Sequence, residues 1–236
     1  MIDLAIKQMY INSKPFGHWS MVVEPDNAGQ LTMKNIQGRF ENFTMKGEAG
    51  WRLLNNSADS FMNISLEGGS LGSLLGHFGY DGVVESESTS MQSDFSWSGY
   101  PWDFETNRLN GSFTMLLKKG RVIETGESSN ILRLFGILNL NTVVRRLQLN
   151  FTDLVKAGVA FDRIKANYLL NSGIAYSQEP LSMDGPSANV NLQGSINIAE
   201  QTLDSQMDVV LPLTSNVPIA AVLLGAPQIA GAGDSK

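Results

Sequence analysis

The chain has 236 residues, a formal net charge of −6 and no cysteine. The acidic balance argues against nucleic acid as a partner, because that binding depends on Lys and Arg contacts to phosphates, and against electrostatic docking to anionic lipid heads. The missing cysteines exclude disulfides, thiolate metal sites and thiol nucleophiles. Charged residues make up only 17% of the chain, below the roughly 25% typical of soluble domains, which suits strands faced with uncharged polar residues.

The first part, about residues 1–126, is rich in strand signals. Apolar residues alternate with polar ones in four stretches, and this period of two is typical of strands with one buried face. The stretches contain Ile2, Leu4 and Ile6; Phe43, Met45 and Trp51; Met91, Phe95 and Trp97; and Phe113, Met115 and Leu117. Asn12, Gly120 and Gly173 are predicted to mark turns between strands. One helical period interrupts the strands at 70–78.

An aromatic run begins within the third of these stretches and continues beyond it. It consists of Phe95, Trp97, Tyr100, Trp102 and Phe104. We expect a strand, a turn and a second strand whose rings pack into the core, because aromatic side chains carry the largest buried area per residue. The alternative is a ligand platform or a membrane-interface anchor.

Residues 127–157 are predicted to form a helical insertion. Their strongest helical period covers 128–140, and shorter helical turns are expected at 142–146 and 152–156. The apolar side of the main helix consists of Ile131, Leu134, Phe135 and Leu138.

The last part, residues 158–236, returns to strands and ends in an apolar tail, in which 218–224 are predicted to be helical. Residues 187–199 alternate cleanly, and Met207, Val209, Leu211 and Leu213 continue the alternation. The most apolar stretch, 217–232, contains two prolines and falls short of the roughly 20 residues that a transmembrane helix needs.

A short pattern recurs four times: an aliphatic residue, a small residue two positions later and an apolar residue two positions after that. Its copies begin at Ile36, Leu109, Ile164 and Leu192. Such repetition predicts a mainly β fold made of one long, strongly curved antiparallel sheet, either an open groove or a flattened barrel. A few short amphipathic helices would pack on or cap its concave face. The function is then expected to be spread along a surface.

The sequence offers little for catalysis. Residues 68–72 fit the G-x-S-x-G string, but the only later histidine, His77, lies seven residues beyond Ser70 in the same short helix. Ser70 is more simply explained as a helix cap. His18 and His77 are far apart without clustered carboxylates or cysteines, so they are interpreted as a strand-face and a helix-end residue. We predict no enzyme, no metal site and no cofactor.

Residues 131–140 and 145–158 closely resemble the C-terminal region of YhdP-like proteins of the AsmA-like family. Further motifs follow in the order expected for that family, and the resemblance covers nearly the whole chain. They are Gly50-Trp51, residues 74–79, Phe95-Ser-Trp97, Phe161-Asp162, residues 171–173, Gly185-Pro186, residues 192–194, 209–212 and 225–228.

The resemblance implies a function that composition does not. Such proteins are long, are anchored in the bacterial inner membrane by an N-terminal helix, and cross the periplasm as a twisted β-groove. They are expected to move phospholipid between the inner and outer membranes and to maintain the outer-membrane barrier. This chain would be a periplasmic portion without the anchor, with phospholipid, and the outer membrane or a protein associated with it, as partners.

A conduit for acyl chains needs apolar strand positions. The candidates for the groove are Phe113, Met115, Val190, Leu192, Ile196, Ile198, Met207, Val209 and Leu211. Ordinary β-sandwich core is the competing interpretation of each, because alternation reveals a buried face without revealing what buries it. A structural or adaptor β-domain that docks the outer membrane or a partner without carrying lipid is the alternative function.

Overall fold

The fold is taken from a computed structural model, which describes residues 1–26, 29–54, 57–79, 84–123, 158–186 and 188–210. The predicted insertion at 127–157 and the tail from 211 onward, with Leu211, lie outside these residues. The division into 1–126, 127–157 and 158–236 therefore stays a prediction.

Strands dominate the described residues, joined by one short α-helix and two 3-10 turns. In chain order the elements are β1 (Ile2–Ile6), β2 (Tyr10–Ile11), β3 (Lys14–Pro15), β4 (His18–Pro25), β5 (Leu31–Phe40), β6 (Phe43–Leu54), β7 (Ser57–Gly68), α1 (Leu71–His77), β8 (Val84–Ser98), η1 (Pro101–Asp103), η2 (Thr106–Arg108), β9 (Asn110–Val122), β10 (Val159–Asn171), β11 (Ile174–Asp184), β12 (Asn189–Asn197) and β13 (Thr202–Val210).

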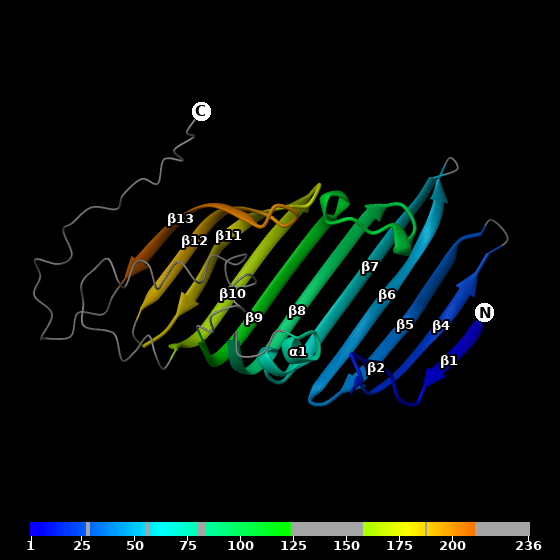
Figure 1. The fold of residues 1–236 in the computed structure, drawn as a ribbon, viewed down its shortest axis with the longest axis horizontal. Helices are drawn as coiled ribbons and strands as arrows, with labels where there is room; N and C mark the ends of the chain where they lie inside the picture. The colour runs from blue at the N-terminus through cyan, green and yellow to red at the C-terminus, as the bar shows by residue number, and fades with distance from the viewer. Residues whose placement is uncertain (27–28, 55–56, 80–83, 124–157, 187, 211–236) are drawn as a thin grey trace, which may run out of the picture.

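Eleven of the strands form a single antiparallel sheet in the order β1-β4-β5-β6-β7-β8-β9-β10-β11-β12-β13. Figure 1 shows them side by side in one long row, with α1 at one end of the strands and the β8–β9 connection at the other. Among the described strands β1 and β13 do not pair, so the sheet is open. The prediction of one long antiparallel sheet is confirmed, and the flattened barrel is not what forms.

The sheet continues without a break across the predicted insertion. Strand β9 pairs with β10 from Val122 opposite Val159 to Gly111 opposite Leu170. The two strand-rich parts of the sequence therefore contribute neighbouring strands to one sheet, although 36 residues separate Val122 from Val159.

Irregular pairing bends several strands. The register shifts in the β4–β5 and β5–β6 ladders coincide with Asn35, whose φ of 50° places it in the left-handed region. In β11 the register with β12 shifts between Tyr176 and Leu181, a stretch that contains Pro180. Bulges increase local twist and bend a strand, and proline is tolerated there because it has no N–H to give to the ladder. These irregular positions are therefore where the strands of the long sheet bend and twist most.

The two sides of the sheet differ sharply in polarity. We call the side that carries the buried hydrophobic cluster the apolar face. On the opposite side, paired residues from β4 to β11 form an unbroken polar row: Ser20, Gln37, Lys46, Ser65, Gln92, Thr114, Asn167 and Glu179. The alternation found in the sequence thus resolves into one apolar and one polar side.

The recurring pattern places its small residues where a neighbour occupies the space of a side chain. A Cβ added to Gly38 would lie 2.5 Å from the ring of Trp19 on the adjacent strand. Gly120 follows the same rule and corrects a prediction: it is not a turn residue but lies within β9, where the ring of Phe161 would be 2.7 Å from a Cβ. Asn12 and Gly173 do lie in turns, as predicted.

Candidate functional site

The apolar face contains one row of residues that crosses the whole sheet, which we call the transverse row. It takes one residue from each of the eleven strands: Ile2, Val23, Met33, Ala49, Met62, Phe95, Gly111, Leu170, Ala175, Ile196 and Leu203. No member has a polar side chain. With neighbouring strands about 4.8 Å apart, ten spacings give a row roughly 48 Å long.

A second apolar row runs parallel to the transverse row, four residues away from it along most of the strands that it crosses. It contains Ile6, Trp19, Gly38, Met45, Leu66, Met91, Met115 and Ala166. The apolar face is therefore a broad strip, and not a single line of side chains.

Exposure changes along the transverse row. Its members on β4 to β9, such as Met33, Met62 and Phe95, are half-buried. Its members on β10 to β12 are buried, with Leu170 6% and Ile196 4% exposed. The half-buried portion thus presents apolar surface to its surroundings, and methionine makes part of that surface adaptable, because the thioether chain is flexible and polarizable.

The predicted groove residues that the structure describes all lie on the apolar face. Met115, Val190, Leu192 and Ile196 are buried within its cluster. Phe113, Ile198, Met207 and Val209 are half-buried and pack against the cluster. Their role in binding lipid stays a prediction. The four residues predicted for the apolar side of the insertion helix lie outside the described residues: Ile131, Leu134, Phe135 and Leu138.

The predicted groove includes only one member of the transverse row, Ile196, and misses the other ten, among them all the half-buried members on β4 to β9. Met33, Ala49 and Met62 come from strands that alternate less cleanly than β12. These residues become neighbours only through the pairing register of adjacent strands, and that register depends on the bulge at Asn35. The signal that could have found them is the spacing of methionines in neighbouring strands.

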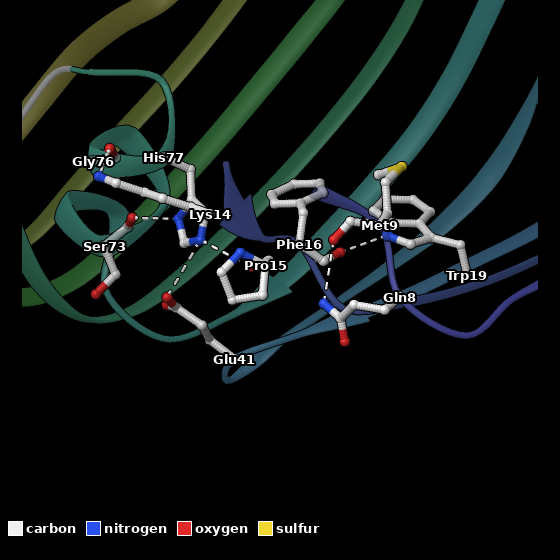
Figure 2. Close-up of polar contacts among 10 residues, drawn as sticks. All are labelled: Gln8, Met9, Lys14, Pro15, Phe16, Trp19, Glu41, Ser73, Gly76 and His77. Atoms are coloured by element: carbon white, nitrogen blue, oxygen red, sulfur yellow. Dashed lines mark hydrogen bonds and ion pairs between the residues drawn. The ribbon is translucent and has the colours of Figure 1, made fainter. Parts of the chain in front are cut away.

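One end of the apolar face is covered, and we call this part the closed end. It consists of α1, the β2–β3 hairpin and an aromatic cluster. In the cluster Phe16 stacks on Phe40 with ring centroids 4.1 Å apart, and Phe40 stacks on Phe43 at 5.4 Å and on Trp19 at 6.0 Å. The indole of Trp19 also donates a hydrogen bond to the Phe16 carbonyl at 2.6 Å. Figure 2 shows Phe16 and Trp19 beside the hairpin.

Helix α1 covers 71–77, within the predicted 70–78, but the expected cap at its start does not form. Ser70 occupies the N-cap position without a side-chain cap. The Leu71 N–H instead donates to Ser86 Oγ at 3.0 Å, while Ser70 Oγ accepts from the Ser86 N–H at 3.4 Å. The cap comes from β8 because Ser86, only 7% exposed, sits directly against the helix start. The simple cap assigned to Ser70 is therefore wrong.

The C-terminal end of α1 is fastened to the hairpin. Lys14 Nζ donates to the Gly76 carbonyl at 2.7 Å, and the Asn12 amide donates to the His77 carbonyl at 3.2 Å. These donors satisfy carbonyls that the helix end leaves without an internal partner. The hairpin and helix therefore form one unit over the strand ends.

His77 is the last residue of α1, as expected, and its ring is engaged away from Ser70. Its Nδ1 lies 3.1 Å from the Ser73 carbonyl, and its Nε2 lies 3.3 Å from the Pro15 carbonyl and 3.6 Å from a carboxylate oxygen of Glu41 (Figure 2). A general base for Ser70 would need to reach its Oγ. His18 lies exposed on β4, with its Nδ1 at the Lys7 carbonyl.

The opposite end of the sheet carries a group of three aromatic rings, of which Trp102 is exposed and Trp51 and Tyr100 are half-buried. Tyr100 and Trp102 stack with centroids 4.8 Å apart, and Trp51 meets both edge-on. The core interpretation holds for Phe95 and Trp97, which pack against the buried cluster. It is wrong for Trp102 and Phe104, which are 70% and 46% exposed, because the turn is followed by η1 and η2 and not by the predicted second strand.

The apolar face is a poorly hydrated environment where it is buried. Tyr168 on β10 is 4% exposed, and this burial raises the pKa of its phenol to about 12. Within the described ranges, no group of three or more His, Asp or Glu side chains could hold a metal ion. No helix in that part of the chain is long and apolar enough to span a membrane.

Fold and surface together define a class: elongated proteins made of one open antiparallel sheet with an apolar face and a polar face. A family model described as "YhdP protein" matches residues 1–233, and the chain belongs to this family. It is also 27% identical over 208 residues to a protein of Escherichia coli strain K12 named "Intermembrane phospholipid transporter YhdP". That match covers 86% of this chain but only 16% of the relative. No solved structure matches the chain.

Proposed function

We propose that this chain is a module of an envelope-spanning lipid transfer protein and carries phospholipid acyl chains along its apolar face between the inner and outer membranes. The observation that carries the proposal is the transverse row, which is apolar in all eleven strands and half-buried from β4 to β9. At roughly 48 Å it exceeds the roughly 30 Å thickness of a bilayer's hydrocarbon core.

The physical basis is the cost of moving acyl chains through water. Each methylene kept out of water is worth about 0.8 kcal/mol, so a continuous apolar strip removes most of the barrier to leaving a bilayer. A single open sheet provides this strip while the charged head group stays hydrated. The task requires no catalytic group and no cofactor, and we propose a non-enzymatic role.

The relative's name supports phospholipid as the cargo. By this proposal the chain is the periplasmic portion of a protein anchored in the inner membrane. It would act near the outer membrane, or near a protein associated with it, and would support the integrity of that barrier.

A structural or adaptor module is the second candidate. The observation that favours it is burial in the later strands, where Ile164 is 0% and Met183 1% exposed. A face that is already filled offers no surface to an acyl chain, and such a domain could dock a membrane or partner without carrying lipid.

The test uses two neighbouring residues on opposite sides of β7. Met62 is half-buried in the transverse row, and Asn63 is exposed on the polar side. Both Met62→Asp and Asn63→Asp add one negative charge, but only Met62→Asp places it on the apolar face. Each protein is purified without detergent, and bound lipid is measured by native mass spectrometry and extraction.

We expect phospholipid on the wild type and on Asn63→Asp, and its loss from Met62→Asp while circular dichroism stays unchanged. Equal lipid on both variants would contradict the conduit. Absence of lipid from all three proteins would favour the structural module.

A further inference from the structure

The methionines of the chain are distributed unevenly over the two sides of the sheet. There are ten, and all of them lie within the described residues. The pairing register places every methionine that a sheet strand carries on the apolar face: Met21, Met33, Met45, Met62, Met91, Met115, Met183 and Met207. Since the chain has no cysteine, all the sulfur of the sheet lies on the side proposed to carry lipid.

Five of these methionines lie on five strands that are neighbours in the sheet, and we call them the methionine group. Met33 on β5 and Met62 on β7 belong to the transverse row, and Met45 on β6 and Met91 on β8 belong to the second row. Met21 on β4 lies between the two rows. An acyl chain that lies along the apolar face from β4 to β8 therefore passes a thioether in whichever row it follows.

The methionine group is accessible, whereas two other methionines of the same face are shielded. All five members are half-buried, but Met115 is only 4% and Met183 only 1% exposed. An oxidant must touch a thioether sulfur to react with it, so exposure should decide which methionines are oxidised. The apolar face thus holds reactive and protected sulfur side by side, and the protected residues serve as internal controls.

A peroxide converts a thioether to a sulfoxide in one balanced step. The sulfur lone pair attacks one oxygen of hydrogen peroxide, an S–O bond forms and the O–O bond breaks. The sulfur loses two electrons, and the departing hydroxide takes up a proton and leaves as water. The product is a polar, chiral side chain. An apolar ligand gains little by resting on it, because burying the new polar oxygen without a hydrogen bond is unfavourable.

We propose that the methionine group is an oxidation site at which peroxide interrupts the apolar face and releases bound lipid. The site itself rests on the placement and exposure of the five residues, and the release of lipid rests on the proposed function. Each sulfoxide holds water on rows that otherwise carry no polar side chain, so the acyl chain beside it is no longer kept out of water. Because sulfoxides can be reduced back to thioethers, the release is reversible.

The first experiment maps the oxidation of each methionine. The full chain is treated with hydrogen peroxide for increasing times, and peptide mass spectrometry measures the sulfoxide fraction at every methionine. We expect Met1, which is 84% exposed, to react fastest, the methionine group to follow, and Met115 and Met183 to react most slowly. Equal rates for the methionine group and the two buried residues would overturn the oxidation site.

The second experiment measures how much phospholipid each protein retains after the same treatment, by native mass spectrometry without detergent. Leucine conserves volume and apolarity and has no sulfur to oxidise. The test variant is Met21→Leu/Met33→Leu/Met45→Leu/Met62→Leu/Met91→Leu, and the control variant is Met115→Leu/Met183→Leu. Retained lipid is expressed relative to the untreated sample of the same protein, so differences in starting affinity do not enter the comparison.

We expect peroxide to remove most of the lipid from the wild type and from the control variant, and little from the test variant. Methionine sulfoxide reductases should restore lipid binding to the oxidised wild type. This recovery, together with an unchanged circular dichroism spectrum, separates the effect of the sulfoxides from a loss of folding.

The outcomes distinguish the inference from the function beneath it. If the wild type keeps its lipid although the methionine group is oxidised, the release is overturned and lipid binding stands. If the test variant loses lipid as the wild type does, other residues cause the release and the assignment is overturned. If the untreated wild type carries no lipid, the proposed function and the release fail together, and the peptide map still decides the oxidation site.

Discussion

The closed end and the β4–β9 part of the transverse row lie on the same face of the same strands, yet they differ in cover. At the closed end Phe40 and Phe43 are 2% and 3% exposed, because α1 and the hairpin fold back over them. In the row Met62 and Phe95 remain half-buried. One alternating pattern thus produces a packed core at one end and an accessible apolar surface beside it. Stability should be concentrated in the first region and binding in the second.

The largest effect is expected from Phe40→Ala at the closed end. The substitution removes a buried ring that stacks on three other aromatic rings. It should lower the free energy of unfolding by about 3–5 kcal/mol, the cost of a large core cavity. Urea denaturation followed by circular dichroism measures the change.

The matched control is Met62→Ala in the transverse row, for which we expect a loss of about 1 kcal/mol. Its side chain is already half-buried, so less contact is lost. Equal losses for the two variants would show that both regions are one core and would remove the distinction between them.

The next expected effect is a loss of stability at high pH, caused by the burial of Tyr168 on the apolar face of β10. Burial raises the pKa of the Tyr168 phenol from its ordinary 10.0 to about 12. The unfolded chain therefore loses the phenol proton first as the pH rises. The stabilisation is complete below pH 10 and is lost as the pH rises from 10 to about 12, at up to about 1.4 kcal/mol per pH unit.

Urea titrations between pH 9 and pH 12 measure this slope, and Tyr168→Phe should flatten it, because it removes the titrating group and keeps the ring. A slope that survives in Tyr168→Phe would mean that other groups cause it and that Tyr168 is not held in a dry environment.

Much of this fold could be predicted from alternation alone. The clean period of two in 187–199 became β12, and the helical period at 70–78 became α1. The single antiparallel sheet followed from the number of such segments. The family resemblance was confirmed by comparison. The expectation that the ligand is a phospholipid came from this resemblance, because no pattern in the residues indicates a lipid.

The details of the surface could not be predicted, because they depend on register and on backbone approach. The transverse row requires the bulge at Asn35, and a shift of one residue would move Met33 to the polar side. Gly120 was misassigned to a turn, since a sequence does not show that the ring of Phe161 lies over it. The helix cap from Ser86 comes from a strand 15 positions further along the chain.

The smallest expected effect tests how the closed end is fastened to the sheet. If Ser86 caps α1, Ser86→Ala should cost about 1 kcal/mol of stability, the usual value for a lost N-cap, and should speed hydrogen exchange at the Leu71 amide. Ser70→Ala should cost less, because Ser70 Oγ accepts only one long hydrogen bond, 3.4 Å from the Ser86 nitrogen. Ser96→Ala, at an exposed position on the same strand, is the control. The reverse order, with Ser70→Ala the more harmful, would restore the local cap. It would also mean that α1 covers the apolar face by its own stability and not by attachment to β8.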